Sequence, residues 1–183
     1  MSALKFFNQT PHIAQYQVYR GDMRVARLPG IAPGASLVVP VYNDCIVTAS
    51  TWLQGNLYTS APLRVNKAAR FLAQVRQDAA RGTYDFEVRV LPSSSTTQMQ
   101  FEKTCEAPVS FSLSHPMAPA QLLRVEDAFT LRTLNVAEQF SVTAVINGVT
   151  TDELCTADPD AVITAVSSSS DGQAPYCTLQ LRH

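Results

Sequence analysis

The amino-acid sequence predicts an all-β protein built from two tandem antiparallel β-sandwich-like modules related by an internal repeat. Three observations support this fold class. Apolar and polar residues alternate over several segments, prolines and glycines interrupt the chain every 8–12 residues, and sequence blocks of the first half recur in the second. Short strands at even spacing, separated by turns, are typical of sandwiches and barrels. With 46% hydrophobic residues among 183, the chain can form a substantial core.

Two segments of the first half show the clearest strand pattern. In residues 14–18 alanine, tyrosine and valine alternate with glutamine, and in residues 84–90 tyrosine, phenylalanine and valine alternate with charged residues. A period of two with polar residues on the other side predicts half-buried antiparallel strands. Between them, the stretch Leu-Pro-Gly-Ile-Ala-Pro-Gly at residues 28–34 predicts the clearest break in the chain.

A tripeptide between two strand-like segments, Arg20-Gly21-Asp22, is the one that many adhesion ligands present to integrins. Glycine accepts positive φ, so a Gly-Asp pair is also expected in a tight hairpin turn. We interpret it as a turn, because the first residues of the chain show no basic segment followed by an apolar run and hence no export signal.

Residues 66–81 allow two interpretations. The segment is rich in helix-forming residues, and three of its apolar residues recur at helical spacing. Its counterpart in the second half, residues 161–166, is β-branched and runs into four serines, which disfavours a helix. If the two copies share a fold, residues 71–76 form a strand, and a short helix in the first copy is the alternative.

Five blocks of sequence recur in the same order, at a nearly constant offset. Order and spacing together predict a duplicated module, and the alternative is two unrelated β segments with similar alternation. The matched blocks are residues 7–10 with 101–104, 14–18 with 109–113, 47–49 with 142–144, 71–75 with 162–166, and 86–90 with 177–181.

A small polar run separates the two copies. Pro92 is followed by three serines and two threonines, a composition typical of a domain boundary. The predicted organisation is therefore a basic β module over residues 1–92, a Ser/Thr linker over 93–98, and an acidic β module over 99–183.

The charge is divided between these halves. The net charge of the chain is −1, but residues 1–92 carry ten Lys and Arg against five Asp and Glu, whereas residues 93–183 carry four against ten. A nucleic-acid binder that neutralises phosphates is expected to be basic overall, so no specific nucleic-acid partner is expected. The asymmetry instead suggests complementary surfaces and head-to-tail association between copies.

The leading functional hypothesis is a non-enzymatic interaction or self-assembly protein that binds itself or another protein. Its candidate interaction residues are Arg20, Arg24, Arg27, Arg70 and Arg76 in the basic half, and Asp152, Glu153, Asp158 and Asp160 in the acidic half. The acidic stretch could also hold calcium, but its spacing matches no EF-hand, and a solvated loop is the preferred interpretation. No metal and no cofactor are expected.

A lectin-like carbohydrate-binding module is the first alternative. Trp52, Asn56 and Tyr58 lie beside an expected loop, where an indole and a phenol could stack on a sugar. Packing of Trp52 between the sheets is the preferred structural interpretation, since tryptophan is highly buried on average. A further alternative is a membrane-active or toxin-like β protein whose basic half meets an anionic lipid surface.

The sequence indicates no enzyme. None of the familiar nucleophile, metalloprotease, P-loop or dinucleotide motifs occurs, although a site assembled from distant residues would leave no such mark. The four cysteines lack the paired spacing of zinc sites and are expected mostly as core thiols, with Cys177 on a buried strand. A cytoplasmic location is expected, and export without a cleaved signal is the alternative.

Overall fold

The computed structural model describes residues 2–168 and 176–182, and eighteen β-strands lie among them. The all-β fold class is thereby confirmed. No helix in these two ranges is long and apolar enough to cross a membrane. The chain divides into two compact units, and each unit contains segments from both halves of the sequence. Unit 1 comprises Met1–Tyr42, Pro116–Ala118 and Ala137–His183, and unit 2 comprises Asn43–His115 and Pro119–Val136.

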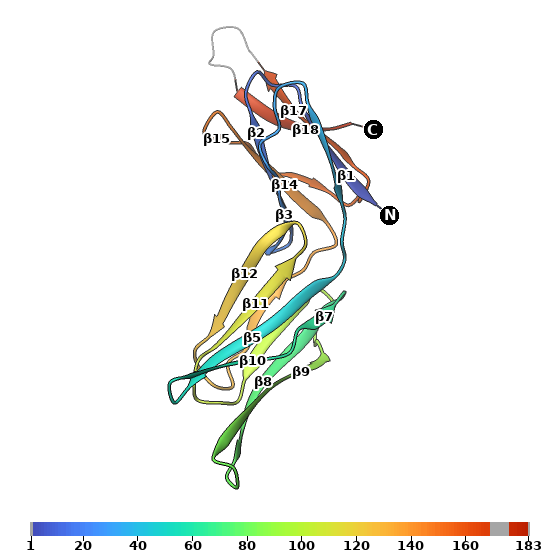
Figure 1. The fold of residues 1–183 in the computed structure, drawn as a ribbon. Coiled ribbons are helices and arrows are strands. Elements are labelled where there is room, and N and C mark those ends of the chain that lie inside the picture. The colour runs from blue at the N-terminus through green and yellow to red at the C-terminus, as the bar shows by residue number, and fades with distance from the viewer. Residues whose placement is uncertain (1, 169–175, 183) are drawn as a thin grey trace. The chain divides into compact units, whose positions relative to one another are not determined.

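Unit 1 contains a four-stranded and a five-stranded sheet. The first has the order β18-β17-β1-β4, and the second has the order β15-β14-β2-β3, with β16 also paired to β14. Figure 1 shows the blue amino-terminal strands of this unit beside the orange and red carboxyl-terminal ones. The strands are β1 (Ala3–Asn8), β2 (Ala14–Arg20), β3 (Met23–Arg27), β4 (Ser36–Pro40), β14 (Phe140–Ile146), β15 (Val149–Thr150), β16 (Leu154–Thr156), β17 (Val162–Ser168) and β18 (Tyr176–Arg182).

Unit 2 contains a second pair of sheets. Their orders are β13-β10-β8-β9 and β12-β11-β5-β6, with β7 also paired to β5. The strands are β5 (Cys45–Leu53), β6 (Asn56–Thr59), β7 (Leu63–Val65), β8 (Ala69–Asp78), β9 (Thr83–Pro92), β10 (Gln98–Lys103), β11 (Val109–His115), β12 (Ala118–Val125) and β13 (Arg132–Asn135).

The two units have the same strand order, but each position that a strand from the first half of the chain occupies in unit 1 is occupied in unit 2 by a strand from the second half, and vice versa. Strand β1 runs parallel to β17, as β10 does to β8, and β2 is antiparallel to β14, as β11 is to β5. Each pairing joins one strand from the first half of the chain to one from the second. The expected boundary at residues 93–98 therefore does not separate the compact units, since β9 and β10, on either side of it, both lie in unit 2.

The pairing also shifts two of the matched sequence blocks by one residue. The match between the two halves of the sequence aligns Phe7 with Phe101. In the structure Phe6 is the buried equivalent of Phe101, and Phe7 is 38% exposed. Likewise Phe71 corresponds to Ile163 in the pairing with β10 and β1. Since a one-residue slip in a strand reverses which side chains face the core, burial distinguishes the two alignments.

The segment with helical composition is a strand. Residues 69–78 form β8, whose antiparallel ladder with β9 runs over its whole length. The strand prediction for residues 71–76 is thus confirmed, and the helical alternative is wrong. Strand β8 pairs with β9 on one side and β10 on the other, and Phe71 is buried against Phe101, with stacked rings 5.2 Å apart. These interactions outweigh the helix propensity of the local sequence.

The expectation of mostly buried thiols is wrong. All four cysteines are free, but only Cys45 is buried; Cys105 and Cys177 are half-buried and Cys155 is exposed. Burial raises the pKa of the Cys45 thiol to about 11, so it stays protonated at neutral pH. Cys177 does lie on strand β18, but it is half-buried because β18 is an edge strand of its sheet.

Candidate functional site

Trp52 lies near the end of β5 with its side chain directed outward. It is 65% exposed, and Leu57, directly opposite on β6, is 54% exposed. The interpretation that this tryptophan packs between sheets is therefore wrong. Along β5 the buried residues alternate with outward ones up to Thr51, which places Trp52 on the outer face of the sheet.

Trp52 is one of the residues that line an open groove of about 700 Å³. Three segments of unit 2 form it: the turn after β5, the paired strands β8 and β9, and the loop between β10 and β11. The lining residues are Trp52, Leu53, Gln54, Val75, Gln77, Tyr84, Cys105, Glu106, Ala107 and Pro108. Glu106 is the one charged residue among them, and the others present aromatic, aliphatic, thiol and amide groups.

Polar contacts order the aromatic side of the groove. The Gln54 side-chain amide donates a hydrogen bond to the Tyr84 hydroxyl at 2.9 Å. Tyr58 meets Tyr84 edge to face, with ring centroids 6.4 Å apart. The Asn56 amide donates to the Gln54 carbonyl at 3.4 Å. Of the three residues predicted from the sequence, Trp52 lines the groove, while Asn56 and Tyr58 contact its lining residues.

The turn that carries Gln54 has the geometry of a tight two-residue hairpin. Gln54 and Gly55 both have positive φ, at 49° and 80°. This conformation matches the right-handed twist of the flanking strands and is favoured by glycine at the second position. The turn therefore holds the end of β5, with Trp52, in a defined place.

The opposite wall of the groove is held by a buried lysine. Lys103 is fully buried at the end of β10, and its Nζ donates to the carbonyls of Cys105 and Glu106 at 2.9 and 3.0 Å. A buried ammonium needs such hydrogen-bond partners to offset desolvation. Tyr84 and this loop could not be identified from the sequence, because they come near Trp52 only through strand pairing. Gln54 is close to Trp52 in the sequence, but its residue type alone does not indicate a site.

The candidate basic residues are divided between the two compact units. Arg20, Arg24 and Arg27 belong to unit 1, whereas Arg70 and Arg76 belong to unit 2. The Arg20 Nε donates to the Ala137 carbonyl, and its guanidinium lies over the Phe140 ring. Arg24 lies over Tyr19.

The two arginines of unit 2 form ion pairs within their own sheet. Arg70 pairs with Glu102, and Arg76 pairs with Glu87 at 2.8 Å. Together with the contacts of Arg20 and Arg24, these pairs occupy four of the five candidate basic side chains within the chain.

The candidate acidic residues have different roles. Asp158 accepts a hydrogen bond from the Asp160 backbone N–H, and Asp160 accepts one from the Ala3 N–H, both at 2.9 Å. Asp158 therefore stabilises its own loop, and Asp160 connects that loop to the start of β1. Asp152 lines a cavity of unit 1, and Glu153 is exposed. Among the described residues, no three His, Cys, Asp or Glu side chains are grouped so that they could hold a metal ion.

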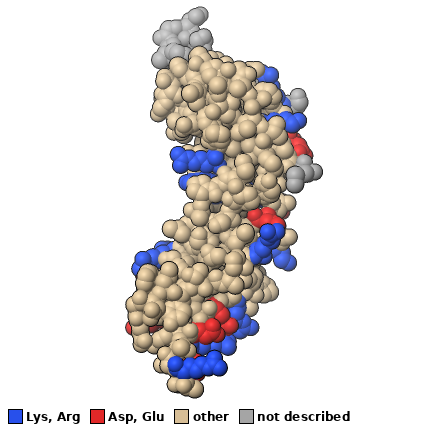
Figure 2. Space-filling view, in the orientation of Figure 1, with Lys and Arg blue, Asp and Glu red and all other residues tan. Residues whose placement is uncertain are grey.

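Each compact unit contains strands from both halves of the chain, and the charge asymmetry between the halves therefore largely cancels within each unit. Counted over the compact units, unit 1 carries five Lys and Arg against seven Asp and Glu, and unit 2 carries nine against eight. The net charges are therefore −2 and +1. Figure 2 shows a mostly uncharged face, on which most of the acidic side chains lie beside basic ones.

Comparison with known proteins found no family model, no curated protein and no solved structure that matches this chain.

Proposed function

We propose that this chain is a non-enzymatic binding protein that holds a carbohydrate in the groove beside Trp52. The observation that carries the proposal is the 65% exposure of the only tryptophan in the sequence, which lines a groove. Leaving an indole in water forgoes a large burial energy, and such aromatic side chains are typical anchors for ligands.

The chemistry of the groove favours a neutral polar ligand. A sugar ring has an apolar face that stacks on an aromatic ring and hydroxyl groups that bond to amides. Trp52 supplies the aromatic surface, and Gln54, Gln77 and Tyr84 supply hydrogen-bonding groups. A groove without Lys or Arg among its lining residues is poorly suited to phosphate or nucleic acid.

A glycan array tests this proposal. We expect the wild-type chain to be retained on a small set of neutral glycans and Trp52→Ala to lose at least about tenfold in affinity for them. Leu122→Ala is the matched control, because Leu122 is an apolar side chain, 74% exposed, on the same sheet outside the groove. An empty array, or equal retention of Trp52→Ala, contradicts the proposal.

Self-association is the second candidate function. The observation that favours it is the pairing of strands from the first half of the chain with strands from the second half. In each unit, strands of residues 1–42 or 43–92 pair with strands of the other half. The same pairings are available between two copies, which is the usual route to domain-swapped assemblies. Association through complementary basic and acidic halves has less support, since the net charges of the units are small.

The salt dependence of sedimentation separates these two routes. Association by strand exchange is expected to persist at high salt and to grow with the protein concentration during refolding. Association by charge complementarity is expected to weaken as salt is added. A chain that stays monomeric after refolding at every concentration contradicts the self-association candidate.

A further inference from the structure

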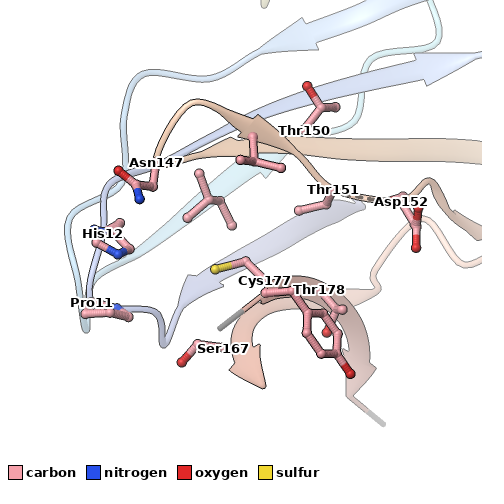
Figure 3. Close-up of a pocket in the computed structure, with 12 residues that line it drawn as sticks. Pro11, His12, Asn147, Thr150, Thr151, Asp152, Ser167, Cys177 and Thr178 are labelled. Atoms are coloured by element: carbon pink, nitrogen blue, oxygen red, sulfur yellow. Dashed lines mark hydrogen bonds between the residues drawn. The ribbon is translucent and has the colours of Figure 1, made fainter. Parts of the chain in front are cut away.

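We propose that unit 1 contains a second small-molecule site, separate from the Trp52 groove, that binds a small organic cation through Asp152. The site is a cavity of about 370 Å³ formed entirely by residues of unit 1. Figure 3 shows the Cys177 sulfur directed toward the side where His12 and Asn147 lie, with Asp152 at the opposite end.

The cavity occupies the same place in unit 1 as the Trp52 groove does in unit 2. Each lies between a two-residue hairpin turn, the loop after a central strand, and the antiparallel pair β17–β18 or β8–β9. The turns correspond closely, since φ is 50° and 77° at Asn147 and Gly148, and 49° and 80° at Gln54 and Gly55. Two hollows at equivalent positions indicate that this architecture forms a pocket there.

The supporting buried group is also equivalent. Asn8 ends β1 as Lys103 ends β10, and both are fully buried. The Asn8 amide donates to the His12 carbonyl at 2.7 Å, just as Lys103 donates to the loop that lines the Trp52 groove. The wall that carries His12 is therefore held in place by a buried hydrogen bond.

The lining of the cavity favours a cation. Asp152 is exposed, and no described residue forms an ion pair with it. Lys and Arg are absent from the described residues that line the cavity. Tyr176, which is 51% exposed, adds an aromatic ring that can attract an ammonium group.

The rest of the cavity suits a small apolar body. Val149 is 68% exposed and lines the cavity, so it offers aliphatic surface beside the threonine hydroxyls. A ligand with one ammonium group and a compact apolar part satisfies both ends of the cavity. An anionic ligand would meet the Asp152 carboxylate, while the described lining residues include no Lys or Arg to compensate its charge.

The cysteine in the cavity wall provides a direct assay of occupancy. Cys177 is half-buried and lines the cavity, whereas Cys155 is exposed and lies outside it. The intact chain is treated with iodoacetamide, and alkylation of each cysteine is followed by peptide mass spectrometry. The probes are benzylamine, benzyl alcohol and benzoate, which share a shape and differ in charge.

We expect benzylamine to slow alkylation of Cys177 and to leave that of Cys155 unchanged, with benzyl alcohol weaker and benzoate weakest. Asp152→Asn is expected to reduce the benzylamine effect roughly two- to fivefold, the range of an exposed charge pair. The matched control is Glu153→Gln, which removes a neighbouring carboxylate outside the cavity lining and is expected to change nothing.

Three results would overturn this proposal. They are no protection of Cys177 by benzylamine, protection by benzoate that equals it, and full benzylamine protection in a folded Asp152→Asn chain. A Trp52→Ala chain that loses glycan binding but keeps Cys177 protection would separate this site from the proposed function.

Discussion

Phe6 packs against Tyr16 in the core of unit 1, with ring centroids 4.9 Å apart and ring planes tilted by 53°. Unit 2 has the equivalent contact between Phe101 and Phe111, at 5.1 Å and 58°. In each pair, one ring comes from a strand of the four-stranded sheet and the other from the five-stranded sheet. The aromatic pair thus joins the two sheets of a unit and defines which face of each strand is inward.

The first prediction concerns the face of β1. Phe6→Ala is expected to lower the free energy of unfolding by about 3–5 kcal/mol, the usual cost of removing a buried phenylalanine ring. Phe7→Ala should cost far less, because Phe7 is 38% exposed. Denaturant unfolding of the two variants measures both values. Equal costs, or a larger cost for Phe7→Ala, would contradict the pairing described for β1.

The second prediction concerns alkaline pH. Burial raises the pKa of Tyr16 to about 12 from an ordinary value of 10. Below pH 10 the phenol is neutral in both states, so its contribution to stability is complete. As the pH rises from about 10 to 12, the unfolded chain ionises first, and this contribution is lost.

Tyr16→Phe is the variant that tests this titration. It is expected to cost about 1 kcal/mol at neutral pH, because the Tyr16 hydroxyl donates to the Phe7 carbonyl at 2.7 Å. Unfolding free energies measured up to pH 12 should then fall less steeply than in the wild type. Some alkaline loss remains, since the pKa of Cys45 is also raised. If the unfolding free energies of Tyr16→Phe and the wild type fell equally with pH, the alkaline loss of stability could not be assigned to Tyr16.

The third prediction concerns the wall of the Trp52 groove. Lys103→Met removes the donor that holds the carbonyls of Cys105 and Glu106 and is expected to cost about 1–3 kcal/mol of stability. Lys67→Met, at an exposed lysine of the same unit, is the control and should be nearly neutral. Hydrogen exchange of the backbone amides of residues 105–107 should rise in Lys103→Met alone. Unchanged exchange would show that Lys103 does not hold this loop.

The fourth prediction concerns strand exchange. Fragments 1–92 and 93–183 each lack half of the strands of both units, so neither is expected to unfold cooperatively alone. Mixed during refolding, they are expected to form a one-to-one complex with β-sheet circular dichroism. Size-exclusion chromatography and thermal unfolding measure both properties. A monomeric 1–92 fragment with cooperative unfolding would instead favour self-contained tandem modules.

Local patterns predicted the strands well and their partners poorly. The alternation in residues 14–18 was sufficient to place β2, and the match to residues 109–113 identified its equivalent, β11. The alignment of β1 with β10 from the sequence is wrong by one residue. Phe6 and Phe7 are adjacent, and the sequence shows no alternation there that tells which of them faces the core.

The site was harder to predict for a related reason. Trp52 could be singled out from its residue type, but its exposure depends on which face of β5 meets the core. Tyr84 and Glu106 are far from Trp52 in sequence and reach the groove through the pairing of β8 with β9 and β10. The charge division between the halves of the sequence does not carry over to the compact units, since pairing between distant strands mixes both halves within each unit.

The fluorescence of Trp52 tests the central claim most directly, because the single indole is both the reporter and the proposed platform. The chain is titrated with the glycan that retains it most strongly on the array. Binding is expected to shift the Trp52 emission to shorter wavelength and to protect the indole from acrylamide quenching. A glycan that binds without changing either property would contradict the claim that Trp52 holds the ligand.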